Sequence, residues 1–319
     1  IWILFAGILN SITWTARAAV PAAAVATQVA REAGTGANAG CEPTWQLVAS
    51  PNAPSAYNYL EAVKVISADD IWAVGYSQPT VGGIFVPLIM RWNGSQWNIV
   101  STPKLTNGGL FRDIDAVSPN EIYAAGIQLA QGSTYRTLIM KWDGAQWTLE
   151  ATPNLGGSGD NNYLYSIAVI APNDIWAVGN YLSGGTLRNL ALRWQGSAWQ
   201  TFAMPNAGST LDDNWLYSVD GLGSSDVWFV GLYGNQTLTI KYNGSTATIV
   251  PSPNGPAPSA LQSVEMVTAN DVWAIGSYGT GFGNYRTLAL RWNGTQWNVV
   301  STQNPGTADN LLYDLTVIG

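Results

Sequence analysis

The sequence predicts an all-β fold, a β-propeller of four-stranded antiparallel blades, on the basis of three observations. A segment of the type Ile-Trp-Ala-Val-Gly recurs five times, beginning at Ile71, Ile122, Ile175, Val227 and Val272. A second segment of the type Arg-Trp-Asn-Gly follows each copy, beginning at Arg91, Lys141, Arg193, Lys241 and Arg291. The composition agrees, since the 319 residues include 34 Gly and 16 Trp and only 10% are charged. A period of about fifty residues is typical of propellers, so we expect five complete blades and part of a sixth.

The first 33 residues are predicted to form a hydrophobic N-terminal helix. An apolar run, Ile1–Leu9, precedes an Ala-rich stretch that contains Pro21. The run has the length of the core of a secretory signal peptide, and Ala16-Arg17-Ala18 has the form of a cleavage site. The run is too short to cross a bilayer alone, because a free-standing span takes about 20 apolar residues.

A second interpretation treats the same helix as part of the mature protein. Its apolar residues, Pro21 and the Ala-rich sequence before Arg31 and Glu32 resemble the N-terminal helix of type IV pilin-like subunits. The resemblance implies a membrane anchor or the core of an extracellular filament, although Phe5 stands where most bacterial pilins carry an acidic residue. Both interpretations predict an extracellular or cell-surface location, with membrane or filament association through residues 1–33.

Residues 34–44, which include the stretch GTGANAG, are expected to form a flexible linker, and residues 45–319 the propeller. The first repeat contains four short runs rich in β-branched and aromatic residues and separated by turn signals, as the strands of a blade are. These runs, named a to d from the axis outward, are Leu60–Ile66, Ile71–Tyr76, Leu88–Trp92 and Trp97–Ser101.

The repeated turn and ring residues predict how a blade is held together. Asn-Gly or Asp-Gly between strands c and d predicts a type I′ hairpin, whose two central residues have positive φ. The acid before strand b, Asp70 in the first repeat, is expected to accept hydrogen bonds from turn amides. It is also expected to pair with the Arg or Lys of a neighbouring blade. The rings of Trp72, Trp92 and Trp97 are expected to fill the space between blades, each with its indole N–H bonded to a turn carbonyl.

These repeats resemble those of bacterial extracellular propellers with D-[IV]-W-A-V-G and W-[ND]-G-x-x-W segments, which are related to kelch and Asp-box propellers. The resemblance covers Trp45 to the last residue and implies the fold. The paired glycines of a kelch blade are missing, because Tyr76 follows Gly75, and residues 142–147 (WDGAQW) keep only part of an Asp box. We therefore carry over no activity from either family.

The repeat pattern also predicts two strands without a complete blade. Trp45–Ala49 matches strand d and Leu311–Ile318 matches strand a, but strands b and c of that sixth blade have no counterpart. One interpretation is a ring of six or more blades that is cut short. The other is an open sheet edge completed by a neighbouring subunit, because unpaired edges invite strand addition.

The d-to-a and b-to-c loops of a propeller lie on one face around the axis, and here both kinds of loop carry charged residues. The candidate ligand-binding residues are Asp160, Asp212, Asp213, Trp215, Arg136, Arg188 and Arg286. Such a rim can bind a glycan or a peptide, with Trp215 as an aromatic contact, and its carboxylates can ligate calcium. The alternative is that the acids cap the loops and the arginines pair with them.

Composition narrows the classes of function. His is absent and Cys41 is the single Cys, so the usual zinc-ligand sets and Ser-His or Cys-His nucleophile pairs cannot be assembled. The net charge of -7 argues against a nucleic-acid partner. We expect a non-enzymatic propeller without catalytic residues or cofactor that binds a surface glycan, a protein or other copies of itself, in adhesion, recognition or structural display. The alternatives are a filament subunit and a carbohydrate-active lyase or glycosidase.

Overall fold

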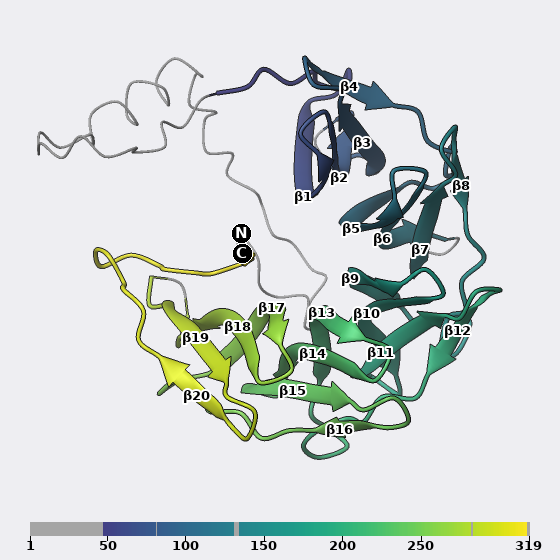
Figure 1. The fold of residues 1–319 in the computed structure, drawn as a ribbon. Helices are drawn as coiled ribbons and strands as arrows, with labels where there is room; N and C mark the ends of the chain where they lie inside the picture. Colours follow the sequence, from purple (N-terminus) through teal and green to yellow (C-terminus); the bar gives the residue numbers. More distant parts are fainter. Residues whose placement is uncertain (1–46, 81, 131–133, 282, 318–319) are drawn as a thin grey trace, which may run out of the picture. The chain divides into compact units, whose positions relative to one another are not determined.

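Five four-stranded antiparallel sheets follow one another along the chain in the computed structural model (Figure 1). The structure describes residues 47–80, 82–130, 134–281 and 283–317. These residues form no helix, and none of them belongs to a helix that could cross a membrane. The architecture is the β-propeller that the repeats predict. The hydrophobic helix predicted for residues 1–33 and the linker predicted for 34–44 lie outside the described residues.

Each sheet contains four strands that are consecutive in sequence. The first sheet consists of β1 (Tyr57–Ser67), β2 (Asp70–Gln78), β3 (Val86–Trp92) and β4 (Trp97–Val100). The second consists of β5 (Gly109–Ser118), β6 (Glu121–Leu129), β7 (Tyr135–Trp142) and β8 (Trp147–Leu149). The third consists of β9 (Asn162–Ala171), β10 (Asp174–Ser183), β11 (Thr186–Trp194) and β12 (Trp199–Phe202). The fourth consists of β13 (Asn214–Gly223), β14 (Asp226–Tyr233), β15 (Gln236–Tyr242) and β16 (Ala247–Ile249). The fifth consists of β17 (Ser259–Thr268), β18 (Asp271–Tyr278), β19 (Arg286–Trp292) and β20 (Trp297–Val300).

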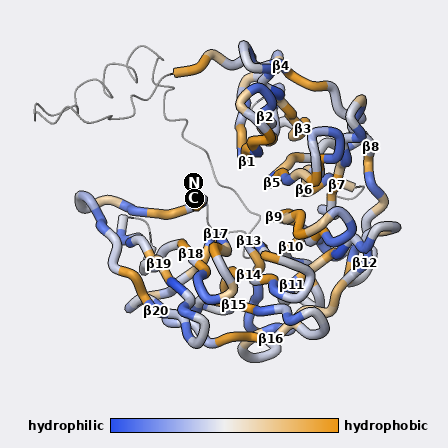
Figure 2. The backbone as a smooth tube through the Cα atoms, in the orientation of Figure 1, coloured by the Kyte–Doolittle hydropathy of each residue, from blue (hydrophilic) through white to orange (hydrophobic). Residues whose placement is uncertain are grey.

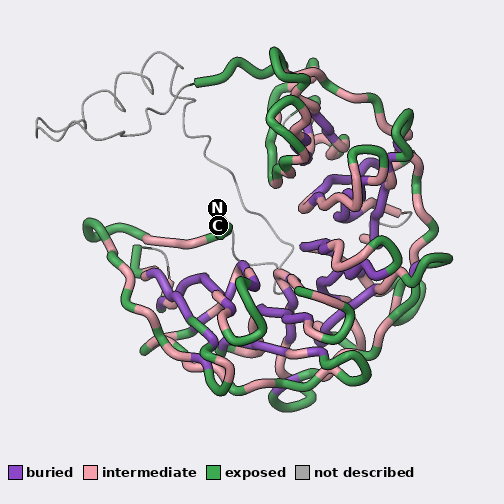
Figure 3. The backbone as a smooth tube through the Cα atoms, viewed as in Figure 1, coloured by how far each residue is buried: buried purple, intermediate pink, exposed green. Residues whose placement is uncertain are grey.

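The hydrophobic core lies between successive sheets. β1 packs beside β5, β5 beside β9, β9 beside β13, and β13 beside β17. Apolar residues are concentrated in the strands (Figure 2), and the buried ones gather where two sheets face each other (Figure 3). In the first of these interfaces Trp72 and Val74 pack with Phe111 and Met140 of the second sheet. Both faces of an inner sheet are therefore covered, which explains why its strands are apolar on both sides.

Aromatic rings connect the sheets, as the sequence predicts. Trp72, on strand b of the first sheet, lies 5.1 Å from Trp142 and 5.6 Å from Trp147 of the second, measured between ring centroids. The fourth and fifth sheets repeat this arrangement, with Trp228 at 5.0 Å from both Trp292 and Trp297. A strand-b ring of one sheet is thus inserted between two rings on strands c and d of the next.

The predicted hydrogen bonds of the indoles are only partly present. Trp92 Nε1 donates to the carbonyl of Ala68 in the a-to-b turn at 3.2 Å, as expected. The prediction is wrong for seven buried indoles, whose Nε1 atoms have no hydrogen-bond acceptor among the described residues: Trp72, Trp147, Trp176, Trp199, Trp228, Trp292 and Trp297. Trp72 and Trp228 lie between the rings of the next sheet, where they contact aromatic side chains and not a turn carbonyl.

The repeated acid and base form ion pairs, but within a sheet. Arg91 donates to Asp70 through Nε at 2.7 Å and through a terminal nitrogen at 3.0 Å. Arg193 and Asp174 form the same forked pair at 2.7 and 2.9 Å. The prediction of pairs between blades is therefore wrong, because the b-to-c register places each cation beside the acid of its own sheet. The acids accept from these cations rather than serving as turn fasteners.

The connection from strand c to strand d is not a two-residue type I′ hairpin. Trp92 pairs with Trp97, which leaves the four-residue loop Asn93–Gln96 between them. Gly94 has a φ of 89°, and the Asn93 side chain accepts hydrogen bonds from the N–H groups of Ser95 and Gln96 at 3.1 and 3.0 Å. The side chain before the glycine thus supplies the acceptor, as Asp143 does in the second sheet, and Gly94 supplies the residue with positive φ.

Among the described residues, neither predicted strand of a sixth blade is present. Residues 311–317 form no strand, and neither do residues 47–49; Trp45, Gln46 and Ile318 lie outside the described residues. A strand needs a partner ladder, and the described residues contain no strand c for residues 47–49 and no strand b for residues 311–317. The C-terminal segment is nevertheless attached to the fifth sheet, because Ser263 Oγ donates to Asp314 Oδ1 at 2.8 Å.

Candidate functional site

The predicted rim arginines bind backbone carbonyls. Arg136 donates to the carbonyls of Ser158 and Asp160 in the β8–β9 loop. Arg188 donates to the carbonyl of Thr210 in the β12–β13 loop. Arg286 repeats the pattern with the carbonyl of Ala308 at 3.1 Å. Arg136 and Arg188 therefore tie the start of strand c to the loop that leads to the next sheet, and Arg286 ties it to the segment that follows β20.

The predicted rim acids accept backbone N–H groups. Asp160 accepts from Gly157 at 2.6 Å, and Asp212 accepts from Ser209 at 2.6 Å. The Ser209 amide, together with the charge of Arg188, lowers the pKa of Asp212. Asp213 accepts from the N–H of Leu187 at 2.8 Å and so joins the β12–β13 loop to β11. All these contacts stabilise loops.

The structure does not gather the seven predicted rim residues at one point. Asp160 and Arg136 belong to one sheet junction, Asp212, Asp213 and Arg188 to the next, and Arg286 to a third. Trp215 lies half-buried on β13, beside the second group. Among the described residues, no group of three or more Asp, Glu or Cys side chains is arranged to hold a metal ion.

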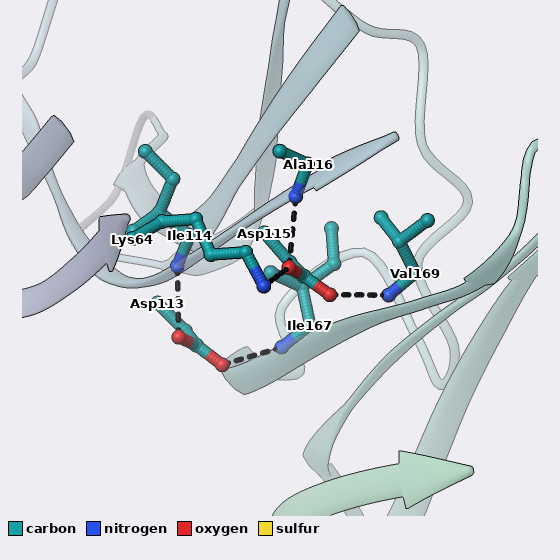
Figure 4. A network of polar contacts seen from close by, with 7 residues as sticks. All are labelled: Lys64, Asp113, Ile114, Asp115, Ala116, Ile167 and Val169. Atoms are coloured by element: carbon teal, nitrogen blue, oxygen red, sulfur yellow. Dashed lines mark hydrogen bonds and ion pairs between the residues drawn. The ribbon is translucent and has the colours of Figure 1, made fainter. Parts of the chain in front are cut away.

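A second polar network, which the sequence analysis did not identify, links the first strands of successive sheets (Figure 4). Asp113 on β5 accepts the N–H of Ile167 on β9 at 2.8 Å, and also that of Ile114 at 2.8 Å. Two residues further, Asp115 accepts the N–H of Val169 on β9 at 2.6 Å. These two acids replace the strand ladder that β5 and β9 do not form, since each belongs to a different sheet.

The same device recurs at the fourth and fifth sheets. Asp220 on β13 accepts the N–H of Met266 on β17 at 2.6 Å, and Ser218 Oγ accepts that of Val264 at 3.2 Å. The spacing between the two acceptors matches that of Asp113 and Asp115. The side chains of the first strands therefore fasten neighbouring sheets at their inner ends.

The charge at one position of this network differs from sheet to sheet. The residues equivalent to Asp115 are Lys64 in the first sheet, Ala168 in the third, Asp220 in the fourth and Glu265 in the fifth. Lys64 Nζ lies 2.6 Å from Asp115 Oδ1. We call Lys64, Asp115, Asp220, Glu265 and Asp314 the inner-strand cluster. It combines one cation with four carboxylates.

The pKa values show that these charges interact. Burial, followed by the charges of Asp220 and Asp314, raises the pKa of Glu265 to about 7, while the charge of Lys64 opposes the rise. Burial tends to lower the pKa of Lys64, but the charge of Asp115 outweighs it and the pKa is raised. Burial raises the pKa of Asp113 to about 7, against the opposing effect of the N–H of Ile167. The carboxylates thus outnumber the cation that is available to neutralise them.

The raised pKa of Asp113 predicts a pH-dependent stability. In the unfolded chain this carboxyl has a pKa of 3.8, and in the folded chain of about 7. For an acid with a raised folded pKa, the unfolded state ionises first, so the contribution to stability is complete below pH 3.8 and is lost as the pH rises to 7. We expect the free energy of unfolding of the wild type, relative to Asp113→Asn, to fall by about 4 kcal/mol across this range.

Urea unfolding at several pH values between 4 and 8 measures this difference. Asp143→Asn provides the control, because hydrogen bonds from the N–H groups of Gln146 and Ala145 lower the pKa of this exposed carboxyl. Its removal should act in the opposite direction and only near pH 4. Parallel curves for the wild type and Asp113→Asn would contradict the assignment of Asp113.

Comparisons with known proteins identify the architecture. No family model matches the chain, and no curated protein matches it. Among solved structures, a protein of unknown function from Dyadobacter fermentans is similar at 11% sequence identity and a TM-score of 0.50, covering 73% of this chain and 75% of that one. YCF48 from Cyanidioschyzon merolae is similar at 16% identity and a TM-score of 0.47, over 82% of this chain and 89% of that one. A GH74 xyloglucanase from Xanthomonas campestris is similar at 14% identity and a TM-score of 0.28, over 77% of this chain and 42% of that one. At these identities the likeness concerns the fold alone.

Proposed function

We propose that this propeller is a non-enzymatic recognition module, displayed outside the cell, that binds a cationic group of a surface protein at the inner-strand cluster. The observation that carries the proposal is the position of Glu265, whose pKa is raised to about 7 by burial and by Asp220 and Asp314. A bound amine or guanidinium would relieve this repulsion, because an opposite charge nearby favours the ionised carboxyl.

The distribution of repeated and unrepeated residues supports the same site. The acid and the cation that recur in every sheet hold its strands together, as Arg91 with Asp70 illustrates, and the arginine that three sheets share holds a loop, as Arg188 with Thr210 illustrates. The inner-strand cluster differs from sheet to sheet, with Lys64, Asp115 and Glu265 at one position of the repeat. A residue that packing does not dictate is available for recognition.

Binding of basic peptides tests the proposal. Calorimetric titration with poly-Lys and poly-Arg, and with poly-Glu as the reference, should show binding of the basic polymers only. We expect Glu265→Gln to weaken binding about ten-fold, the size of one charge-assisted contact of about 1.4 kcal/mol. Affinity for the wild type should rise as the pH increases through 7, because Glu265 then ionises.

The rim residues provide the matched comparison. Arg188→Ala removes a cation from the rim and leaves the inner-strand cluster unchanged. If Glu265→Gln left the affinity unaltered while Arg188→Ala, or alanine at Asp213, Trp215 and Arg188 together, abolished binding, the ligand would bind at the rim and our choice of site would be wrong.

One observation favours a second candidate, a carbohydrate-active enzyme. A carboxyl with a pKa of about 7 close to other acids, as Glu265 is, has the properties of a general acid in glycosidases. Incubation with a panel of polysaccharides, with product detection and Glu265→Gln as the inactive reference, separates this candidate from the proposed function. If the wild type releases products and Glu265→Gln does not, the protein is an enzyme and the proposed recognition function is wrong.

A further inference from the structure

One face of the first sheet is exposed, whereas the equivalent face of each of the other four sheets is covered by the sheet before it. We call the side that contacts the previous sheet the preceding face. The preceding faces of the second to fifth sheets share a large apolar side chain on the first strand that is completely buried, namely Phe111, Leu164, Leu216 and Leu261 at 0% exposure each. Leu60 occupies this position in the first sheet and is 50% exposed.

A second position on the same strand shows the same contrast. The exposures are 4% for Ile114, 3% for Ile167, 5% for Val219 and 3% for Val264, against 62% for Val63. Burial of such side chains is the main source of stability between sheets, at about 25 cal/mol for each Å² of apolar surface. The preceding face of the first sheet is therefore an apolar surface of the kind that four other sheets cover with a neighbour.

This face also carries a preformed slot for an aromatic ring. Trp92 and Trp97, on strands c and d, lie 6.0 Å apart. The corresponding pairs of the second and fifth sheets have the same separation, 6.0 Å for Trp142 and Trp147 and 5.9 Å for Trp292 and Trp297. Those two pairs each hold the strand-b indole of the previous sheet. In the described part of the chain, no third ring contacts Trp92 and Trp97.

The fifth sheet has the complementary feature on its other face. Trp273 is its strand-b ring, equivalent to Trp72 and Trp228. Arg291 lies over this ring at 5.1 Å, but no other aromatic ring of the described residues contacts it. The chain thus has an unfilled slot in the first sheet and an uninserted ring in the fifth.

We propose that the preceding face of the first sheet binds a further four-stranded sheet of this same repeat, which inserts its strand-b Trp or Tyr between Trp92 and Trp97. The four interfaces within the chain argue for this occupant, because each is built from the same positions and in three of them, including that of Trp194 and Trp199 at 6.0 Å, the slot has the same dimensions. An unrelated apolar partner would have no reason to match the spacing of the two indoles.

An extended chain tests the proposal. A second copy of residues 259–296 is placed directly before Trp45, so that Trp45–Ala49 follows the copy as Trp297 and β20 follow the original. Val63→Lys is then introduced into the natural and the extended chain. We expect it to change the midpoint of thermal unfolding by less than about 2 °C in the natural chain and to lower it by at least about 6 °C in the extended chain, where it buries a charge.

Two controls make the result specific. Val299→Lys, on an outer strand and 56% exposed in the natural chain, should have little effect in either background. Trp273→Ala, made only in the added copy, removes the ring that would enter the slot and should weaken the effect of Val63→Lys. A second extended chain with a copy of residues 214–246 repeats the test with the inserted ring of Trp228.

The outcomes decide the proposal. A small effect of Val63→Lys in both extended chains, or failure of both to fold, would show that the face does not accept a sheet of this repeat. Sedimentation of the natural chain as a dimer that Val63→Lys dissociates and Trp273→Ala leaves intact would identify the first sheet of a second copy, bound face to face, as the occupant and would overturn the proposal. A large effect confined to the extended chains would confirm it.

Discussion

Replacement of Trp228 by Ala is expected to lower the free energy of unfolding by about 4 kcal/mol, as the loss of a large buried aromatic does. The ring is completely buried and lies 5.0 Å from both Trp292 and Trp297. Its removal leaves a cavity between two rigid indoles on adjacent strands, which cannot close without moving the fifth sheet. Urea denaturation monitored by circular dichroism measures the change in the free energy of unfolding.

Trp273→Ala provides the matched control. It has the same place in its sheet, but it is only half-buried and contacts Arg291 instead of two rings. We expect a loss of about 1 kcal/mol, since most of the transfer and cavity cost is absent. Equal losses for the two variants would show that insertion between the rings does not stabilise the sheet interface.

Gly179→Ala is expected to destabilise the protein by about 3 kcal/mol through overpacking. Gly179 ends the repeated segment on β10, where it pairs with Leu164 of β9 beside an irregularity of the register. A Cβ atom at this position would lie 1.9 Å from the carbonyl oxygen of Tyr163, a backbone atom that cannot move without distorting β9. Thermal unfolding of the variant should begin well below that of the wild type.

Gly223→Ala is the corresponding control. Gly223 ends β13, and a Cβ there would meet no atom within 4 Å. The substitution should therefore be neutral within about 0.5 kcal/mol. A similar loss of stability for both variants would mean that reduced backbone freedom, and not contact with Tyr163, explains the repeated glycine.

The repeats predict the propeller because its regular features are local. Strand positions follow from short apolar runs and from turn residues, and the recurring glycine of each repeat reflects the close approach of strand a to strand b. The partner of Asp70 could not be predicted in the same way. The distance in sequence to Arg91 is compatible with a pair inside a sheet or between sheets, and only the strand register decides it.

The inner-strand cluster was missed for a physical reason. An alignment of repeats emphasises residues that recur, and these turn out to stabilise strands, loops and interfaces. Lys64, Asp115 and Glu265 occupy one position with different chemistry. The signal was present in the alternation Asp113-Ile114-Asp115, which places two acids on one side of a strand. The distance between side chains on different sheets could come only from the structure.

A recurring Asn after strand d was not predicted to have a structural role, although it is recognisable in the sequence. The segment after strand d carries a recurring Asn whose side chain accepts the N–H of a residue on strand c. The pairs are Asn154 with Thr137 at 2.9 Å, Asn206 with Asn189 at 2.8 Å, Asn254 with Thr237 at 2.7 Å and Asn304 with Thr287 at 2.8 Å. Pro precedes three of these four Asn residues, so the dipeptide marks the point where the chain leaves one blade.

Because every sheet consists of four strands adjacent in sequence, no pairing has to wait for a distant part of the polypeptide. During translation each hairpin can form as soon as it leaves the ribosome and then find a ready template in the sheet made just before it. Unfolding should start at the terminal sheets, because each has one neighbouring sheet, and should reach the central sheets last. Such an order protects the second to fourth sheets from proteolysis while the ends fluctuate.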